Sequence, residues 1–481
     1  MQNQRLFFGF FTKKMKKLFI PNLLLSIFLL PWHLCGQHNF NNNLIFYSDS
    51  IGTVYLDMPL VTLPSQIHAY KTTGGFFKSY MNPGLDNSLT YSADMYSSVH
   101  YGLKSAARIK KSKGAQIFLQ RLLVSGFDVV SQWLPLGAPW LHEEYHRGVM
   151  SQYGINSFNE VLLFPFGKSS IAVNKVKDED LAMLCDYHHS DFVRLMSAGH
   201  EAEVHLVRNL QSNEFFYHQN LDNEVLYIMY SIQNIMYVSM CANGSGDENT
   251  KKRNAIETTI ASRDFTGMDM NAWIDALCNP DKPYSARGIH PSGVGINRYI
   301  MYEDISAEGR KYLQRQVYLD IFNFMSPMML GFSHIRLANT EAGAWYGNFA
   351  FRHYLTSFGD DVSLDLYLQS PKFNLYTTFH SYNNLNHHFG GIEAGLIDFP
   401  LLDNHLQLGG TVMFWVQPKD MLFHTGKGEA GGLVKAKIAY NYRFIAPTLE
   451  IGWKSKGWVA GNVSLKPSFF LWFGIRWKIT R

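Results

Sequence analysis

The C-terminal third of the chain alternates between apolar and polar residues, a period of two that indicates β-strands. The alternation is clearest in segments 362–369, 405–417, 434–443 and 469–480. From residue 340 onward we count roughly eight or nine such segments, most about ten residues long and separated by turn residues. A tilted strand of that length crosses a lipid bilayer, and this dyad pattern is typical of outer-membrane β-barrels.

The alternation therefore predicts an antiparallel β-barrel of about eight strands over residues 340–481. A soluble antiparallel sheet or sandwich alternates in the same way and is the alternative. Three features favour the barrel: the strands are long, Trp and Tyr are frequent near their ends, and the last strand runs to the C-terminus. One departure is that the chain ends in Thr480-Arg481 rather than in an aromatic residue.

Residues 115–335 follow a helical period instead. Apolar residues recur at helical spacing between Ile117 and Val130, and a second helix is predicted to begin near Pro139. Further helices are predicted over much of 178–242 and over 307–325. The run from Val225 to Met240 is apolar on most faces, which favours a buried helix, with a membrane span as the alternative.

The expected fold class is therefore α+β, with a helical domain over 115–335 followed by the barrel. Residues 37–114 give no clear period and are predicted to be an irregular or β segment.

The N-terminus has the pattern of a secretory signal peptide over residues 1–36. A basic segment around Lys13 precedes an apolar run from Leu18 to Leu30, and small residues follow near Gly36. Met15 would open a signal of ordinary length. We expect a protein secreted across the inner membrane; a retained signal anchor is the alternative.

Composition narrows the function classes. The chain of 481 residues carries a formal net charge of +4, and only 17% of its residues are charged. No basic block dominates, so nucleic acid is not an expected partner. Past the signal the cysteines are Cys185, Cys241 and Cys278, which can form at most one bridge; buried free thiols are favoured over a disulfide.

Residues 142–146 read His-Glu-Glu-Tyr-His, the pattern H-E-x-x-H. On a helix, His142 and His146 lie one turn apart on the same face and can bind one Zn²⁺ ion. Glu143 lies beside them and can accept a proton from a metal-bound water. The sequence therefore predicts a zinc site with Glu143 as the catalytic base.

A catalytic zinc site needs a third protein ligand. We predict Glu201 for this role, with His205 as a neighbouring or substrate-side group, because both lie on one face of a later helix. The histidine pair at 188–189 is a rival source of a ligand, although adjacent helical residues point about 100° apart.

With these motifs the chain resembles the gluzincin metallopeptidases of the HtpX and CAAX-endopeptidase type, over residues 115–335. That family carries H-E-x-x-H and, on a later helix, S-R-x-x-E-x-x-A-D. Ser197 and Glu201 match the second motif, whereas Ala198, Val204 and His205 replace its Arg, Ala and Asp. The resemblance implies zinc bound by His142, His146 and Glu201, with Glu143 as base. It also implies a substrate-side role for His290, which is followed by Pro291, and for Arg298.

The predicted function is a zinc-dependent endopeptidase of the bacterial envelope. The helical domain would lie in the periplasm, the barrel in the outer membrane, and the substrate would be a protein or peptide. The alternative is a non-catalytic outer-membrane protein whose helical domain serves scaffolding or assembly. A transporter or porin is not expected, because side chains fill the interior of a barrel of about eight strands.

Overall fold

The structure is a computed structural model that describes residues 44–45, 52–66, 84–107, 113–159 and 172–479. The predicted signal peptide lies outside the described residues. Helices and strands both contribute large parts of the fold, and the α+β class predicted from the sequence is confirmed.

The helices lie mostly in the first two thirds of the chain. They are α4 (Leu85–Ala107), α5 (Lys113–Val130), α6 (Ala138–Ser151), α7 (Asp178–Tyr187), α8 (His189–Tyr217), α9 (Glu224–Asn243), α10 (Asp247–Ile256), α11 (Asp269–Cys278) and α12 (Ala307–Leu319). A short 3₁₀ helix, η6 (Asp320–Phe324), follows α12.

The strands of the main sheet are β1 (Leu44–Ile45), β2 (Val54–Leu63), β5 (His334–Thr340), β6 (Gly343–Leu355), β7 (Asp360–Gln369), β8 (Asn374–Asn384), β9 (His387–Leu401), β10 (Leu406–Pro418), β11 (Gly428–Tyr440), β12 (Ile445–Lys454) and β13 (Ser468–Ile479). A separate short hairpin pairs β3 (Phe158–Asn159) with β4 (Val173–Asn174).

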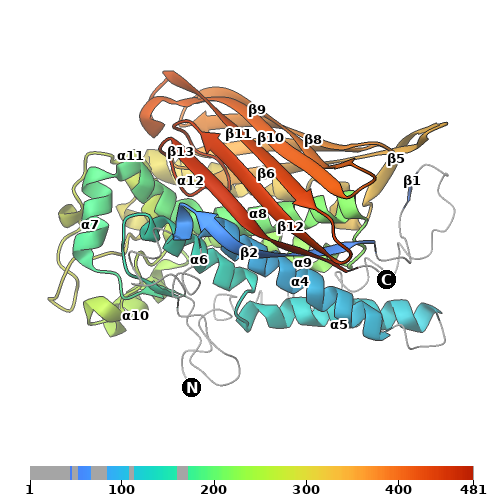
Figure 1. The fold of residues 1–481 in the computed structure, drawn as a ribbon. Coiled ribbons are helices and arrows are strands. Elements are labelled where there is room, and N and C mark those ends of the chain that lie inside the picture. The colour runs from blue at the N-terminus through green and yellow to red at the C-terminus, as the bar shows by residue number, and fades with distance from the viewer. Residues whose placement is uncertain (1–43, 46–51, 67–83, 108–112, 160–171, 480–481) are drawn as a thin grey trace.

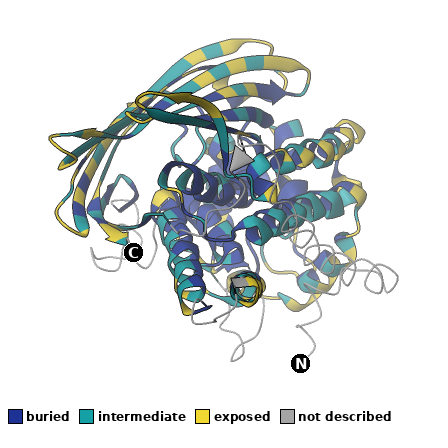
Figure 2. Cartoon of the chain, turned by 90° about the vertical axis from the view of Figure 1, so that its right-hand side faces the viewer, coloured by how far each residue is buried: buried dark blue, intermediate teal, exposed yellow. Residues whose placement is uncertain are grey.

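The main sheet is an antiparallel meander. Strands β5 to β13 pair with their neighbours in chain order, β2 adds to the free side of β13, and β1 adds to β5. Figure 1 shows this sheet arching over one side of the helices. Figure 2 shows buried residues concentrated where the helices and the sheet face each other.

Helix α8 lies between the other helices and the sheet. It packs against α6, α9 and α11 on one side and against β6 on the other. The principal hydrophobic core lies among the helices and includes Tyr145 of α6, Leu206 of α8 and Trp273 of α11, all fully buried. One end of the sheet joins this core through Leu355 and Phe423.

The inner face of the sheet is polar and is tied to α8 by ion pairs. Arg208 of α8 lies 3.3 Å from a carboxylate oxygen of Asp365 on β7 and 3.1 Å from one of Glu393 on β9. Arg352 of β6 lies 3.1 Å from the other oxygen of Asp365. Buried ions need such partners, and these pairs fix the helix against the sheet.

The prediction of a closed barrel is wrong, because the sheet stays open. Its outermost members β1 and β2 do not pair with each other. The interior of an eight-stranded barrel is just wide enough for side chains. Here the concave side of the sheet instead holds a 29-residue helix, α8, which needs a wider and open shell.

The segment predicted to be irregular or β contains a strand and also a helix that was not predicted. Residues 85–107 form the helix α4, and residues 54–63 form β2, which pairs with the C-terminal strand β13. Helix α9 is apolar and long enough to cross a membrane, and 44% of its most apolar window is buried inside the structure. It packs against α12, α8 and α5, as expected for a core helix.

Candidate metal centre

The H-E-x-x-H residues lie on α6, as the sequence predicts. Gly137 precedes the helix in an extended conformation, and a proline occupies its first turn, where no backbone N–H is needed. Four residues apart, His142 and His146 share one face, and their ring centroids lie 5.0 Å apart.

His142 is oriented by helix α8. Its Nδ1 lies 3.2 Å from Oε1 of Glu203, so this nitrogen donates to the carboxylate and Nε2 is the ring nitrogen that faces Asp269. The ring packs directly on Gly199, one turn before Glu203 on the same face of α8. A side-chain atom on Gly199 would lie only 2.2 Å from His142 Nε2, so only glycine allows this approach.

His146 is oriented in the same way by a backbone group. Its Nδ1 donates to the carbonyl oxygen of Leu195 at 2.6 Å, which leaves Nε2 as the free nitrogen. The residue is fully buried, yet Nε2 has no hydrogen-bond partner among the described residues. A buried polar atom without a partner is costly and needs an explanation.

Both Nε2 atoms face one carboxylate oxygen, Oδ2 of Asp269. This oxygen lies 3.1 Å from Nε2 of His142 and 3.5 Å from Nε2 of His146. Asp269 is the first residue of α11, where the positive end of the helix dipole favours a negative charge. Three candidate ligand atoms therefore converge on one point.

The spacing of these atoms fits a metal ion. The three ligand atoms lie within 4.8 Å of one another. Two ligands of a tetrahedral zinc ion, each about 2.0–2.2 Å from the metal, are separated by roughly 3.3 Å. Orientation of each imidazole by a hydrogen bond at its other nitrogen is the usual arrangement around a bound metal.

Glu143 lies in the same environment. It is nearly buried, and burial raises the pKa of its carboxyl to about 7, although the charge of His142 opposes this. Burial lowers the pKa of His142, but the hydrogen bonds that its ring donates to the carboxylates of Asp269 and Glu203 outweigh burial and raise that pKa well above its ordinary value. For Asp269, the neighbouring histidines outweigh burial and lower the pKa.

Glu201, predicted as the third zinc ligand, does not lie in this group. Its Oε1 accepts from Arg194 at 3.0 Å and from the backbone N–H of Gly461 at 2.7 Å. The reason is helical geometry, because residue 201 lies about 200° around the helix from residue 199, which faces α6. Asp269, and not Glu201, is the carboxylate that faces the two histidines.

His205 shares the face of Glu201, as predicted, but this face points towards the sheet. Its Nδ1 accepts a hydrogen bond of 3.2 Å from the hydroxyl of Tyr145. Burial, aided by the charge of Arg208, lowers the pKa of His205 to about 3. A neutral imidazole in this place serves packing between α6, α8 and the sheet.

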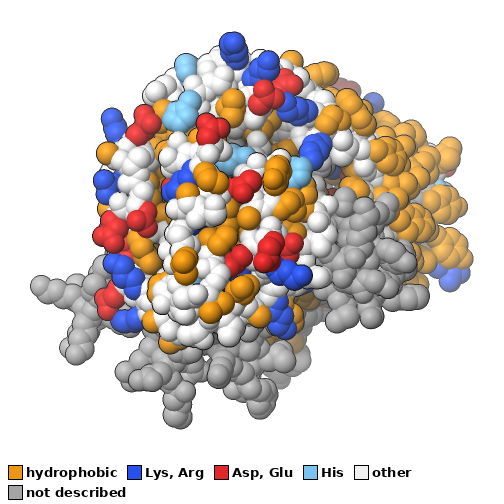
Figure 3. Space-filling model, turned by 90° about the vertical axis from the view of Figure 1, so that its left-hand side faces the viewer, with side chains coloured by type: hydrophobic (Ala, Val, Ile, Leu, Met, Phe, Trp, Pro, Cys, Tyr) orange, Lys and Arg blue, Asp and Glu red, His pale blue; other side chains and the backbone are white. Residues whose placement is uncertain are grey.

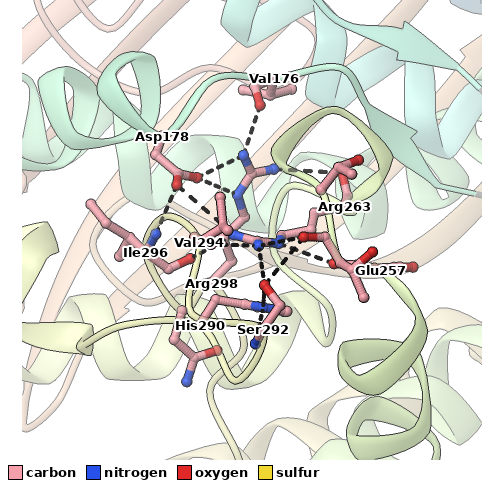
Figure 4. Close-up of polar contacts among 12 residues, drawn as sticks. Val176, Asp178, Glu257, Arg263, His290, Ser292, Val294, Ile296 and Arg298 are labelled. Atoms are coloured by element: carbon pink, nitrogen blue, oxygen red, sulfur yellow. Dashed lines mark hydrogen bonds and ion pairs between the residues drawn. The ribbon is translucent and has the colours of Figure 1, made fainter.

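His290 and Arg298 lie in a separate polar cluster, shown in Figure 4. Nδ1 of His290 accepts from the backbone N–H of Ser292 at 3.1 Å. This hydrogen bond stabilises the loop that carries His290. Arg298 is fully buried, lies 2.7 Å from Oδ1 of Asp178 and donates to the carbonyl of Val176 at 2.7 Å. The structure does not place either residue among the groups that face the two imidazoles.

Arg298 nevertheless stands in indirect contact with the site. It donates to the carbonyl of Asp264 at 3.2 Å, and the next residue, Phe265, packs its ring against His146 at 4.8 Å. The loop then leads into Asp269. Arg298 is therefore a positioning residue for the segment that carries Asp269.

A second group of similar composition joins His200 of α8, Asp320 of η6 and His353 of β6, all fully buried. Oδ1 of Asp320 lies 2.9 Å from His200 Nε2 and 2.7 Å from His353 Nδ1. These are lengths of charge-assisted hydrogen bonds, shorter than the spacing of zinc ligands. We therefore interpret this group as a set of hydrogen bonds that joins the helices to the sheet.

Replacing Gly199 with Ala should weaken metal binding. The added methyl group would press on His142 at Nε2 and turn the ring away from Asp269. We expect zinc affinity to fall by at least the roughly 10- to 100-fold seen when the orientation of a ligand is lost. Competition with a zinc chelator would measure this.

The matched control is Gly102→Ala in α4, where an added Cβ meets no atom within 4 Å. This variant should bind zinc as the wild type does and be slightly more stable, because alanine is the better helix former. Equal zinc affinity in the two variants would contradict the close packing of His142 on α8.

Comparisons with protein-family models, with curated proteins and with solved structures found no match for this chain. The functional argument therefore rests on the geometry of the residues.

Proposed function

We propose that the protein is a zinc-dependent endopeptidase with a site formed by His142, His146 and Asp269. The observation that carries this proposal is the convergence of two imidazole Nε2 atoms and one carboxylate oxygen. Both Nδ1 atoms are already used as donors to Glu203 and to the carbonyl of Leu195. Without a metal ion, Nε2 of His142 hydrogen-bonds the Asp269 carboxylate at 3.1 Å. On loss of that proton the two Nε2 atoms and the carboxylate oxygen can serve as ligands, and N/O ligands in this number suit Zn²⁺.

Zinc bound there would lower the pKa of a water molecule and polarise a substrate carbonyl. Glu143 follows the first ligand on α6 and would accept the proton at its carboxylate and return it to the leaving amine. Its low exposure, 8%, removes competing water and keeps the carboxyl ready to exchange a proton. Glu203 would hold His142 in place through Nδ1.

Peptide hydrolysis is the reaction class that H-E-x-x-H supports. The resemblance to gluzincins covers this first motif, whereas the third ligand departs from that family, since Asp269 takes the place of Glu201. The predicted secretory signal supports action in the bacterial envelope on proteins or peptides.

The direct test is the zinc content of the purified full-length chain, measured by elemental mass spectrometry. We expect about one zinc ion per chain, the number that one three-ligand site binds. Asp269→Asn should lose the ion, because an amide is a poor zinc ligand. Glu201→Gln should keep it, since Glu201 pairs with Arg194 instead. Loss with Glu201→Gln and retention with Asp269→Asn would overturn the proposed ligand set.

The second candidate function is a non-catalytic envelope protein in which zinc has a structural role. The observation in its favour is low accessibility: the His142 side chain is 13% exposed and His146 is fully buried. A cavity of about 410 Å³ lies between α8 and the sheet and is lined by His205 and Arg208, but by none of the three proposed ligands. Zinc binding without peptidase activity would select this function.

A further inference from the structure

The outer face of the sheet, defined as the strand residues of β5 to β13 that point away from α8, is predominantly apolar. Its exposed large side chains are Leu337, Phe349, Leu366, Phe379, Ile392, Val412, Phe414, Val416, Val434, Ile438, Tyr440, Leu449, Ile451, Trp453, Phe469, Phe473 and Trp477. Among the exposed residues described in these strands, Lys478 alone carries a formal charge, and it lies one residue from the end of β13. So large an exposed apolar surface marks an interaction site.

The charges of the sheet lie on its opposite face. Asp365 and Glu393 point inward to Arg208, and Arg476 of β13 pairs inward with Asp398 and Asp57 at 2.8 and 2.9 Å. A sheet in water buries its apolar face and exposes its polar one. This sheet has the reverse polarity, which is the arrangement of strands that face lipid.

The apolar band is bounded by charge at both ends. Exposed charged residues lie in the turns at one end, among them Lys419, Asp420 and Lys427, and in the turns at the other end, among them Glu341, Lys372, Asp403 and Arg443. Strands β6 to β13 are 10 to 15 residues long. About 9–11 residues suffice for a tilted strand to cross a bilayer, so the band matches a hydrocarbon layer in height.

Backbone groups on the edge of β2 that does not pair with β13 are hydrogen-bonded by side chains of the protein. The backbone N–H of Asp57 donates to Asp94 of α4 at 2.7 Å, and that of Thr62 donates to Oε1 of Gln66 at 3.0 Å. The amide of Gln66 in turn donates to the carbonyl of Leu60 at 3.3 Å. Side chains thus satisfy edge groups that would be costly in hydrocarbon.

The shape of the face selects lipid over a second copy of the chain. Figures 1 and 2 show the sheet arched over the helices, so its outer face is convex. Two convex faces would touch along a narrow strip and leave most of these side chains in water. A fluid hydrocarbon layer can cover the whole surface. The end of the molecule with α7 and α10 exposes interspersed acidic and basic side chains, as suits contact with water (Figure 3).

We propose that the outer face of β5 to β13 lies in the hydrocarbon of a lipid bilayer, although the sheet is open. This inference goes beyond the proposed zinc chemistry and does not depend on it. The charged turns at the two ends of the band would then lie at the two boundaries with water. The chain would be an integral membrane protein whose lipid contact is made by an incomplete barrel.

Tryptophan fluorescence tests this placement. Trp453 and Trp477 lie on the outer face with 49% and 44% exposure, whereas Trp273 and Trp458 are fully buried. The full-length chain would be reconstituted into phosphatidylcholine vesicles with or without bromine on the acyl chains. Bromine should quench the wild type, and the quenched fraction should fall in Trp453→Phe/Trp477→Phe but not in Trp458→Phe. An equal quenched fraction in the wild type and in Trp453→Phe/Trp477→Phe would overturn the proposal.

A charge substitution gives a second readout. Ile451→Lys places a charge within the apolar band, whereas Tyr442→Lys places it in the exposed turn between β11 and β12. With folding in detergent checked by circular dichroism, only Ile451→Lys should lose incorporation into vesicles. Incorporation of both variants, or a dimer that stays soluble without lipid or detergent, would overturn the proposal. Asp269→Asn should incorporate normally, so failure of the zinc proposal would leave this one standing.

Discussion

Glu143→Gln should abolish most peptidase activity while leaving zinc bound. The amide keeps the size of the side chain but cannot accept a proton, and Glu143 is not among the three proposed ligands. Loss of a general base costs about 100- to 10,000-fold in rate. Hydrolysis of fluorescently labelled casein by the reconstituted full-length chain, with zinc content measured on the same samples, gives both quantities.

Glu144→Gln is the matched control on the same helix. Glu144 pairs with Arg147 and accepts from Asn159 at 2.8 Å, away from the imidazoles. This variant should keep its zinc, and its activity should stay within a few-fold of wild type. The substitution alters the surroundings of the site but removes no group that takes part in the reaction. Full peptidase activity in zinc-loaded Glu143→Gln would contradict the role of Glu143 as general base, whereas zinc-loaded wild type without peptidase activity would favour the structural-zinc function.

The sequence predicts the local elements well because their periods are strong. Helices α5 to α9 and strands such as β7, β10 and β13 fall where apolar residues repeat every 3.6 or two positions. Helix α4 escaped prediction because its buried face carries small polar residues, including Ser88, Ser92 and Ser97, instead of large apolar ones. The sequence also did not predict that the sheet stays open. Alternation determines which side chains lie on each face of a strand, but it does not show whether the outermost strands pair to close a barrel.

For the site, the sequence predicts the pair on α6 but not its partner. Glu201 and Glu203 are two residues apart, and a motif cannot say which face of α8 meets α6. Gly199 was the available signal, because a glycine inside a long helix often marks close approach of another element. Asp269 lies far downstream, and only the fold of the loop held by Arg298 brings it to the histidines.

Asp320→Ala should cause the largest loss of stability. The carboxylate accepts from His200 and His353, all three are buried, and they join α8, η6 and β6. Removing one member of a buried ionic group costs about 3–5 kcal/mol, because the remaining polar groups stay buried without a partner. Denaturant unfolding of the full-length chain in detergent would measure the free energy of unfolding. Asp420→Ala, which breaks the exposed pair with Lys456, is the control and should change little.

The contribution of the same group to the free energy of unfolding should depend on pH in a defined direction. Burial raises the pKa of Asp320, but the charges of His200 and His353 outweigh burial and bring it down to about 2. A carboxyl with a lowered pKa stabilises the fold above its ordinary value of 3.8, and the contribution disappears as the pH falls towards 2. The acid-induced loss of stability should therefore be smaller in Asp320→Ala than in wild type. Zinc content should not change in this variant; a loss of zinc without a loss of stability would instead make this group the metal site.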